Sequence, residues 1–159
     1  MYKRQDTAHS SASATFHVRF STNTSPKWHL AQPYRLIAHN GEINTISGNI
    51  NWATARVENF ESKKLGDLKE YYPLINQEGS DSSSLDNILE LFTLGGVNIG
   101  RAARMLIPPS WQNTDLIDPD EKAFHEYNSM HMEAWDGPAL ICFQSNEFIS
   151  CFLDRNGLR

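Results

Sequence analysis

The first patterned stretch of the chain alternates between apolar and polar residues. In residues 14–21, Phe16, Val18 and Phe20 lie on one face of an extended chain, and polar side chains occupy the other face. This alternation predicts a β-strand with one apolar and one polar face. The polar face, which carries Arg19, is expected either to contact solvent or to line a site.

A second apolar run, residues 34–38, predicts another strand, and a long helical pattern follows over residues 43–64. The helix is predicted from apolar residues that recur at helical spacing. They are Ile46, Ile50, Ala53, Val57 and Phe60. Gly48 and Asn49 are poor helix formers, so the first turn is expected to be irregular.

Three further helices are predicted, at residues 83–94, 99–106 and 119–132. Asp81 or a neighbouring serine is expected to cap the first of them. Glycines and prolines end the first two helices, and Pro119 occupies the first position of the third, where proline is favoured.

The last elements predicted are the two strands of a hairpin, residues 139–143 and 148–153, turning at Ser145 and Asn146. That turn would place Cys142 opposite Ile149, with Cys151 as a diagonal neighbour on the same face. We therefore expect two buried, reduced and non-catalytic thiols rather than a disulfide. Strands, helices and a hairpin in separate blocks indicate an α+β fold.

Composition narrows the class of protein. The chain has 159 residues, 40% of them hydrophobic and 21% charged, which fits one globular domain over residues 14–159. Residues 1–13 are polar and without period, and we expect them to be a disordered or non-native tail. A net charge of −5 argues against a general nucleic-acid binder, and no apolar run reaches membrane-spanning length. Without a signal peptide, a cytoplasmic or organellar (plastid) location is expected.

One short stretch could carry chemistry. Asn40 and Gly41 follow the second predicted strand, and a tight turn there would direct a side-chain amide and a backbone N–H into one small volume, as an oxyanion requires. Arg19 could hold a carboxylate in a bidentate fork, and Asp81 could hold an ammonium group. Together these groups describe a site for an α-amino acid whose side-chain carbonyl is attacked. Plain alternatives remain: an ordinary turn, a surface salt bridge and a helix N-cap.

The sequence offers no evident nucleophile for such a site. No Gly-x-Ser-x-Gly motif is present, the histidines lack metal-ligand spacing, and no metal site is expected. Cys142 and Cys151 lie within apolar strands, where thiols are normally inert.

Several motifs resemble those of one known family, and they occur in the family's order. The resemblance is to the class-II glutamine amidotransferase domain of the large chain of glutamate synthases, and it covers about residues 16–159. The longest motif is residues 38–45. The other matching motifs are residues 19–24, Trp28, residues 30–33, 48–49, 80–82, 135–139 and 154–159.

The resemblance implies an N-terminal-nucleophile hydrolase fold, a four-layer α-β-β-α sandwich. In that family an N-terminal cysteine attacks glutamine and its own amino group is the base. By position, Arg19 would bind the substrate α-carboxylate and Asp81 the α-amino group, while Asn40 and Gly41 would form the oxyanion hole. The ammonia released would reach a separate synthase domain that uses FMN and an iron–sulfur cluster; no cofactor is expected in this segment.

The chain departs from the family in two respects: no cysteine precedes Cys142, and the sequence stops at Arg159, where the family continues. We therefore expect an internal fragment, the C-terminal half of the sandwich, inactive alone. L-Glutamine, the remainder of the large chain, and a small reductase subunit or ferredoxin are the expected partners. The alternative is a non-catalytic glutamine- or glutamate-binding module that lost its nucleophile.

Overall fold

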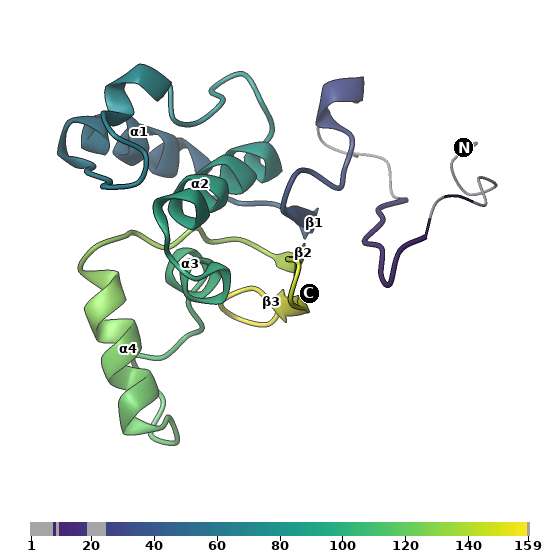
Figure 1. Cartoon of the computed structure of the whole chain (residues 1–159). Helices are drawn as coiled ribbons and strands as arrows, with labels where there is room; N and C mark the ends of the chain where they lie inside the picture. Colours follow the sequence, from purple (N-terminus) through teal and green to yellow (C-terminus); the bar gives the residue numbers. More distant parts are fainter. Residues whose placement is uncertain (1–7, 9, 19–24, 159) are drawn as a thin grey trace.

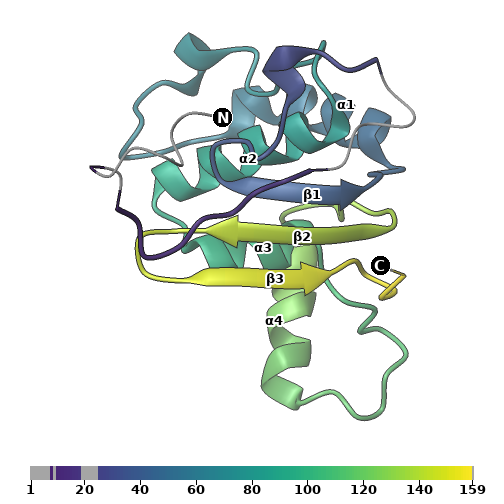
Figure 2. The ribbon, with the colours of Figure 1, turned by 90° about the vertical axis from the view of Figure 1, so that its right-hand side faces the viewer.

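Four α-helices and a three-stranded sheet make up the fold of the described part of the chain, in which the helices all lie on the same side of the sheet (Figures 1 and 2). The computed structural model describes residues 8, 10–18 and 25–158. The strands are β1 (Ile37–Gly41), β2 (Ala139–Gln144) and β3 (Ile149–Leu153), and the helices are α1 (Ile46–Arg56), α2 (Asp81–Gly95), α3 (Ile99–Leu106) and α4 (Pro119–Ser129). Short 3₁₀ helices occupy Trp28–Leu30, Val57–Asn59 and Leu68–Tyr71. The chain thus mixes helices with an antiparallel sheet.

The two faces of the sheet differ in burial. The strands pair antiparallel in the order β1-β2-β3. Ile37, Ile141 and Phe143 lie on the face covered by α2 and α3 and join the apolar residues of those helices in the core. On the other face, Leu140, Ile149 and Leu153 keep 37%, 49% and 48% of their surface exposed. Within the described residues, helices therefore cover only one face of the sheet.

The strand predicted at residues 14–21 is wrong in its described part. Residues 14–18 have no strand structure, and Phe16 and Val18 are exposed rather than buried. This segment passes over the open face of the sheet, where Thr15 bonds the side chain of Gln144 (Figures 1 and 2). Arg19, at the end of the predicted strand, lies outside the described residues.

The second predicted strand begins three residues later than expected. Tyr34 N–H donates to the carbonyl of Ile37, which turns the chain before β1 can start. The strand then continues through Asn40 and Gly41, so these residues end β1 rather than form a tight turn. The helix after it is shorter than residues 43–64, because α1 ends at Arg56 and a 3₁₀ turn follows.

The prediction for residues 99–106 is confirmed residue by residue as α3. Helix α2 begins at Asp81, and its N-cap is the neighbouring Ser80, which forms a reciprocal capping box with Ser83. Helix α4 starts at Pro119 as predicted but ends at Ser129, three residues early.

The hairpin register corrects the expectation for the cysteines. Cys142 pairs directly with Cys151, and their Sγ atoms are 2.7 Å apart as free thiols. The Ser145 hydroxyl accepts from Glu147 N–H and Phe148 N–H, which moves the turn one residue onward. Cys151 is exposed, and Cys142 is only partly buried. Burial is the main cause that raises the pKa of Cys142, to about 11, and the adjacent Cys151 contributes.

His125 in α4 gives a prediction on pH. It is 2% exposed, stacks on Trp111 and has no recorded hydrogen-bond partner at Nδ1 among the described residues. Burial is the main cause that lowers its pKa; Arg104 lowers it further, and Glu121 opposes both effects in part. The unfolded chain therefore holds this proton more tightly than the folded chain. Stability should be retained above the ordinary histidine pKa of about 6.5 and decrease as the pH falls toward the lower folded value.

The measurement is the free energy of unfolding by urea at about pH 7.5 and about pH 5.5. His125→Gln should lose less stability between these values than the parent chain. His29→Gln, at an exposed histidine, is the control and should behave like the parent. Equal losses in His125→Gln and the parent would contradict the prediction.

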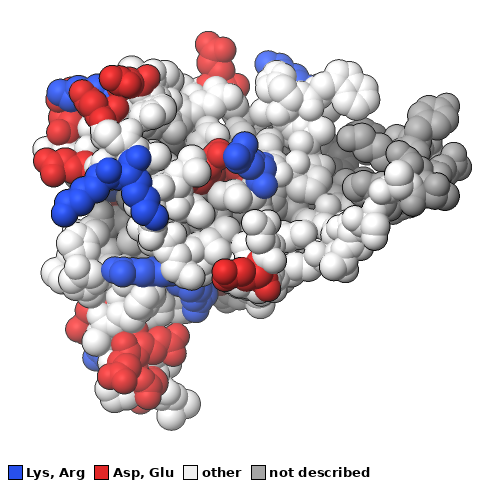
Figure 3. All heavy atoms as spheres, viewed as in Figure 1, with Lys and Arg blue, Asp and Glu red and all other residues white. Residues whose placement is uncertain are grey.

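Charged side chains are distributed unevenly over the face in Figure 3. Acidic side chains gather over α4, which carries Asp120, Glu121 and Glu126, and both signs mix over the upper part of the view. Among the described residues, no helix has the length and apolar character needed to cross a membrane.

Candidate active site

Two glycine-containing segments interlock at the end of β1. A Cβ atom on Gly41 would lie 1.8 Å from the carbonyl oxygen of Pro138, and one on Gly137 would lie 1.9 Å from the carbonyl oxygen of Glu42. Both glycines have positive φ, +150° and +153° respectively. Each segment thus needs a residue without a side chain where the other backbone passes. The pairing fixes the position of Asn40 and Gly41 relative to residues 135–139.

Gly41→Ala should therefore destabilise the fold by about 1–3 kcal/mol, because both the contact with Pro138 and the backbone conformation disfavour a side chain. Gly48→Ala is a matched control: it lies inside α1 with open space around its Cα, so alanine should be neutral or stabilise by about 0.5–1 kcal/mol. Urea unfolding of both variants checks this. A Gly41→Ala protein as stable as Gly48→Ala would contradict the close approach.

The hydrogen-bond pattern between β1 and β2 leaves the N–H of Gly41 pointing away from β2. Glu42 N–H donates to Pro138, and Gln144 N–H donates to Leu36, so the even-numbered residues of β1 turn their backbone groups toward β2. In an antiparallel ladder the intervening residues turn theirs the other way. Gly41 lies in this alternate set, so its N–H points to the edge of β1 that pairs with no other strand of the described residues, where a bound oxyanion could accept it.

Asp81 lies beside the segment that leaves β1. Its Oδ2 accepts from Ile43 N–H at 2.8 Å, and its Oδ1 accepts from Ser82 N–H at 2.8 Å. Asp81 is not the N-cap, since Ser80 has that role. The structure thus brings Asp81 into contact with the backbone of Ile43, two residues beyond Gly41, although Asp81 is far from both in the sequence.

Two further aspartates, for which the sequence predicts no role, fix the backbone of β1 and β2 near Asp81. We call this region, where β1 ends beside Asp81 and residues 135–139, the corner of the site. Asp86, buried in α2, accepts from Leu36 N–H and Ile37 N–H at 2.9 and 3.0 Å, and burial is the main cause that raises its pKa. Asp154 accepts from Ala139 N–H at 2.9 Å and from Leu158 N–H at 3.0 Å. In the sequence, the contact between Asp154 and Ala139 is indicated only by the two family motifs that contain these residues, 135–139 and 154–159.

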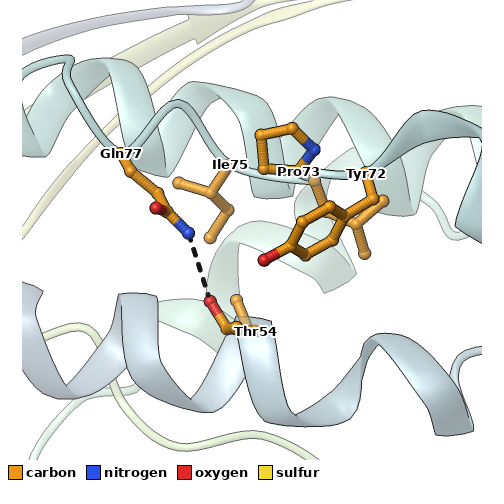
Figure 4. A pocket seen from close by; sticks show the side chains of 7 residues that line it. Thr54, Tyr72, Pro73, Ile75 and Gln77 are labelled. Atoms are coloured by element: carbon orange, nitrogen blue, oxygen red, sulfur yellow. Dashed lines mark hydrogen bonds between the residues drawn. The ribbon is translucent and has the colours of Figure 1, made fainter.

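A depression elsewhere on the surface is separate from this corner. It lies between α1 and residues 72–77, where Gln77 Nε2 donates to Thr54 Oγ1 at 3.5 Å (Figure 4). Asn40, Gly41 and Asp81 do not line it. Among the described residues, no three of the His, Cys, Asp and Glu side chains are grouped as a metal site would need.

Comparison with known proteins identifies the family. The family model described as "Glutamine amidotransferases class-II" matches residues 2–159. The chain belongs to the class-II glutamine amidotransferases. It is 49% identical over 156 residues to "Glutamate synthase [NADPH] large chain" of Bacillus subtilis (strain 168), covering 98% of this chain and 10% of that protein.

Two other relatives of this amidotransferase chain carry different electron donors in their names. It is 47% identical over 148 residues to "Glutamate synthase [NADH]" of Schizosaccharomyces pombe, covering 92% of this chain and 7% of that protein. It is 47% identical over 150 residues to "Ferredoxin-dependent glutamate synthase 2" of Synechocystis sp., covering 92% of this chain and 10% of that protein. The chain spans a tenth or less of these relatives and corresponds to a class-II amidotransferase region of glutamate synthase.

Proposed function

We propose that this amidotransferase chain forms the oxyanion- and amino-group-binding part of a site that hydrolyses L-glutamine to glutamate and ammonia. The observation that carries the proposal is the direction of the Gly41 N–H, which leaves the ladder at the open edge of β1. Asn40 would add its side-chain amide as the second oxyanion donor. Asp81 would hold the α-ammonium group of glutamine, and Arg19 the α-carboxylate.

The attacking group in this proposal is an N-terminal cysteine whose own amino group takes the thiol proton. The chain contains no cysteine ahead of Cys142, and Cys142 and Cys151 lie within the hairpin. The nucleophile would therefore come from a segment outside these residues. We call the chain combined with such a segment the assembled domain.

We further propose that the assembled domain is a four-layer α-β-β-α sandwich of which this chain forms the C-terminal half. The exposed apolar side chains of Leu140, Ile149 and Leu153 support this, since an apolar sheet face is normally covered. A second sheet would pack on that face, opposite α2 and α3.

For the whole protein we propose glutamate synthase activity, in which the ammonia is added to 2-oxoglutarate. FMN and an iron–sulfur cluster would belong to other domains, and none of the residues described here is assigned to them. The named relatives use NADPH, NADH or ferredoxin, so either a small reductase subunit or ferredoxin could deliver electrons. We place the protein in the cytoplasm, or in the plastid if its source is a photosynthetic eukaryote.

A second candidate function is a non-catalytic module that binds glutamine or glutamate. It would use the same groups, at Asn40, Gly41 and Asp81, for binding alone. The two functions can be distinguished experimentally. Only the first predicts that supplying an N-terminal cysteine starts the hydrolysis of glutamine.

The test is ammonia release from L-glutamine, measured for the chain alone and for the assembled domain. The chain alone should remain at background, and the assembled domain should release ammonia and glutamate in equal amounts. An assembled domain that binds glutamine without hydrolysing it would favour the binding module. Ammonia release by the chain alone that is lost on mutating one of its serines or cysteines would show that another nucleophile operates.

A further inference from the structure

The side chain of Gln32 holds the backbone of His39 at the edge of β1. The His39 backbone N–H donates to Gln32 Oε1 at 2.6 Å, and the His39 carbonyl accepts from Gln32 Nε2 at 3.0 Å. The Gln32 amide therefore pairs with the open edge of β1 as a neighbouring strand would. This contact ends one residue before Asn40 and fixes the edge from which the Gly41 N–H projects.

The side chain of His39 makes the second connection. It is 2% exposed, and its Nδ1 lies 2.7 Å from Ser82 Oγ. The Ser82 hydroxyl in turn lies 3.4 Å from Asp81 Oδ1, which also accepts from Ser82 N–H. A chain of contacts thus runs from β1, through Ser82 at the start of α2, to the carboxylate of Asp81.

The hydroxyl proton of Ser82 can be donated either to His39 Nδ1 or to Asp81, and we take the second arrangement because it joins all three side chains. A serine hydroxyl has a single proton, so Ser82 can donate to Asp81 only if its oxygen accepts from His39 Nδ1. The imidazole then carries its proton on Nδ1. With Ser82 donating, Asp81 accepts at Oδ1 from two groups of the same residue and at Oδ2 from Ile43, which fixes the plane of its carboxylate.

We propose that His39 is a positioning residue of the glutaminase site, one that couples the oxyanion donors of β1 to the carboxylate of Asp81. Through Gln32 it fixes the strand edge at Gly41, and through Ser82 it orients the group that meets the substrate ammonium. This inference rests on the proposed function, and it assigns roles to His39, Ser82 and Gln32 that the family match does not give.

The test uses the assembled domain and a double-mutant cycle. His39→Leu should raise KM for glutamine about 3- to 10-fold, the usual effect of one lost hydrogen bond. Ser82→Ala should do the same, and the double variant should be no worse than either single variant, because all three break one contact chain. His39→Asn, which can keep an N–H donor near the Nδ1 position, should recover most of the loss.

The matched control is His125→Leu, an equally buried histidine in α4, which should lower stability and leave KM unchanged. Additive effects of His39→Leu and Ser82→Ala, or a KM unchanged in Ser82→Ala, would overturn the inference. An assembled parent domain without activity would instead count against the proposed function.

One readout does not depend on activity. In ¹⁵N NMR spectra of the chain, His39 should show the tautomer protonated at Nδ1, and Ser82→Ala should shift its Nδ1 signal. A His39 protonated at Nε2 alone would overturn the proton arrangement, and with it the coupling to Asp81.

Discussion

Replacing Asn40 by alanine in the assembled domain is expected to lower kcat for glutamine hydrolysis about 10²–10³-fold and to change KM little. The side-chain amide would donate to an oxygen that becomes negative only in the tetrahedral intermediate. An interaction made mainly in the transition state appears in kcat rather than in substrate binding. Steady-state ammonia release gives both constants.

Asn146→Ala is the matched control for this variant, because Asn146 is an exposed asparagine in the β2–β3 turn. It should retain the parental kcat. An Asn40→Ala enzyme with parental kcat, or one that loses only affinity, would remove Asn40 from the oxyanion hole.

Asp81→Asn should have the second large effect, an increase of about 10- to 100-fold in KM for glutamine, as expected for a lost hydrogen bond to a charged group. Asparagine keeps an oxygen that can accept from Ile43 N–H, so the corner of the site should remain folded. What it loses is the negative charge that would face the substrate ammonium, together with the oxygen that accepts from Ser82 N–H.

Substrate selectivity gives a sharper measurement of the same effect. The parent enzyme should prefer glutamine strongly over an analogue without the α-amino group, and Asp81→Asn should lose most of that preference. Asp120→Asn, another aspartate in the first turn of a helix, should keep it. Equal selectivity in Asp81→Asn and the parent would contradict the proposed role.

Local signals in the sequence were sufficient where neighbouring residues decide the structure. Helix α3 is predicted to the residue: prolines follow soon after its end, and in the structure Asn98 caps its start. The hairpin is predicted, but its register is off, because the hydroxyl of Ser145 selects the turn and alternation alone does not reveal that choice. That difference moves Cys151 directly opposite Cys142.

Contacts between distant segments are harder to predict from the sequence. Residues 40–41 and residue 81 were selected from their residue types, but the reason for glycine at residue 41 is the carbonyl of Pro138, nearly a hundred positions away. The sequence predicts no role for His39, because a histidine between Ala38 and Asn40 has no local signature of a contact with Ser82. Periodicity assigns residues to elements, and it does not specify which side chains meet between elements.

The most direct test of the account is the environment of the Gly41 amide during the formation of a tetrahedral adduct. An aldehyde analogue of glutamate, added to the assembled domain, should form a hemithioacetal with the N-terminal cysteine and present an oxygen where the oxyanion would form. With the glycines labelled with ¹⁵N, the Gly41 amide proton should shift strongly downfield, while that of Gly48 in α1 should not move. Adduct formation, verified by mass, with no change at Gly41 would contradict the central claim that this N–H belongs to the oxyanion hole.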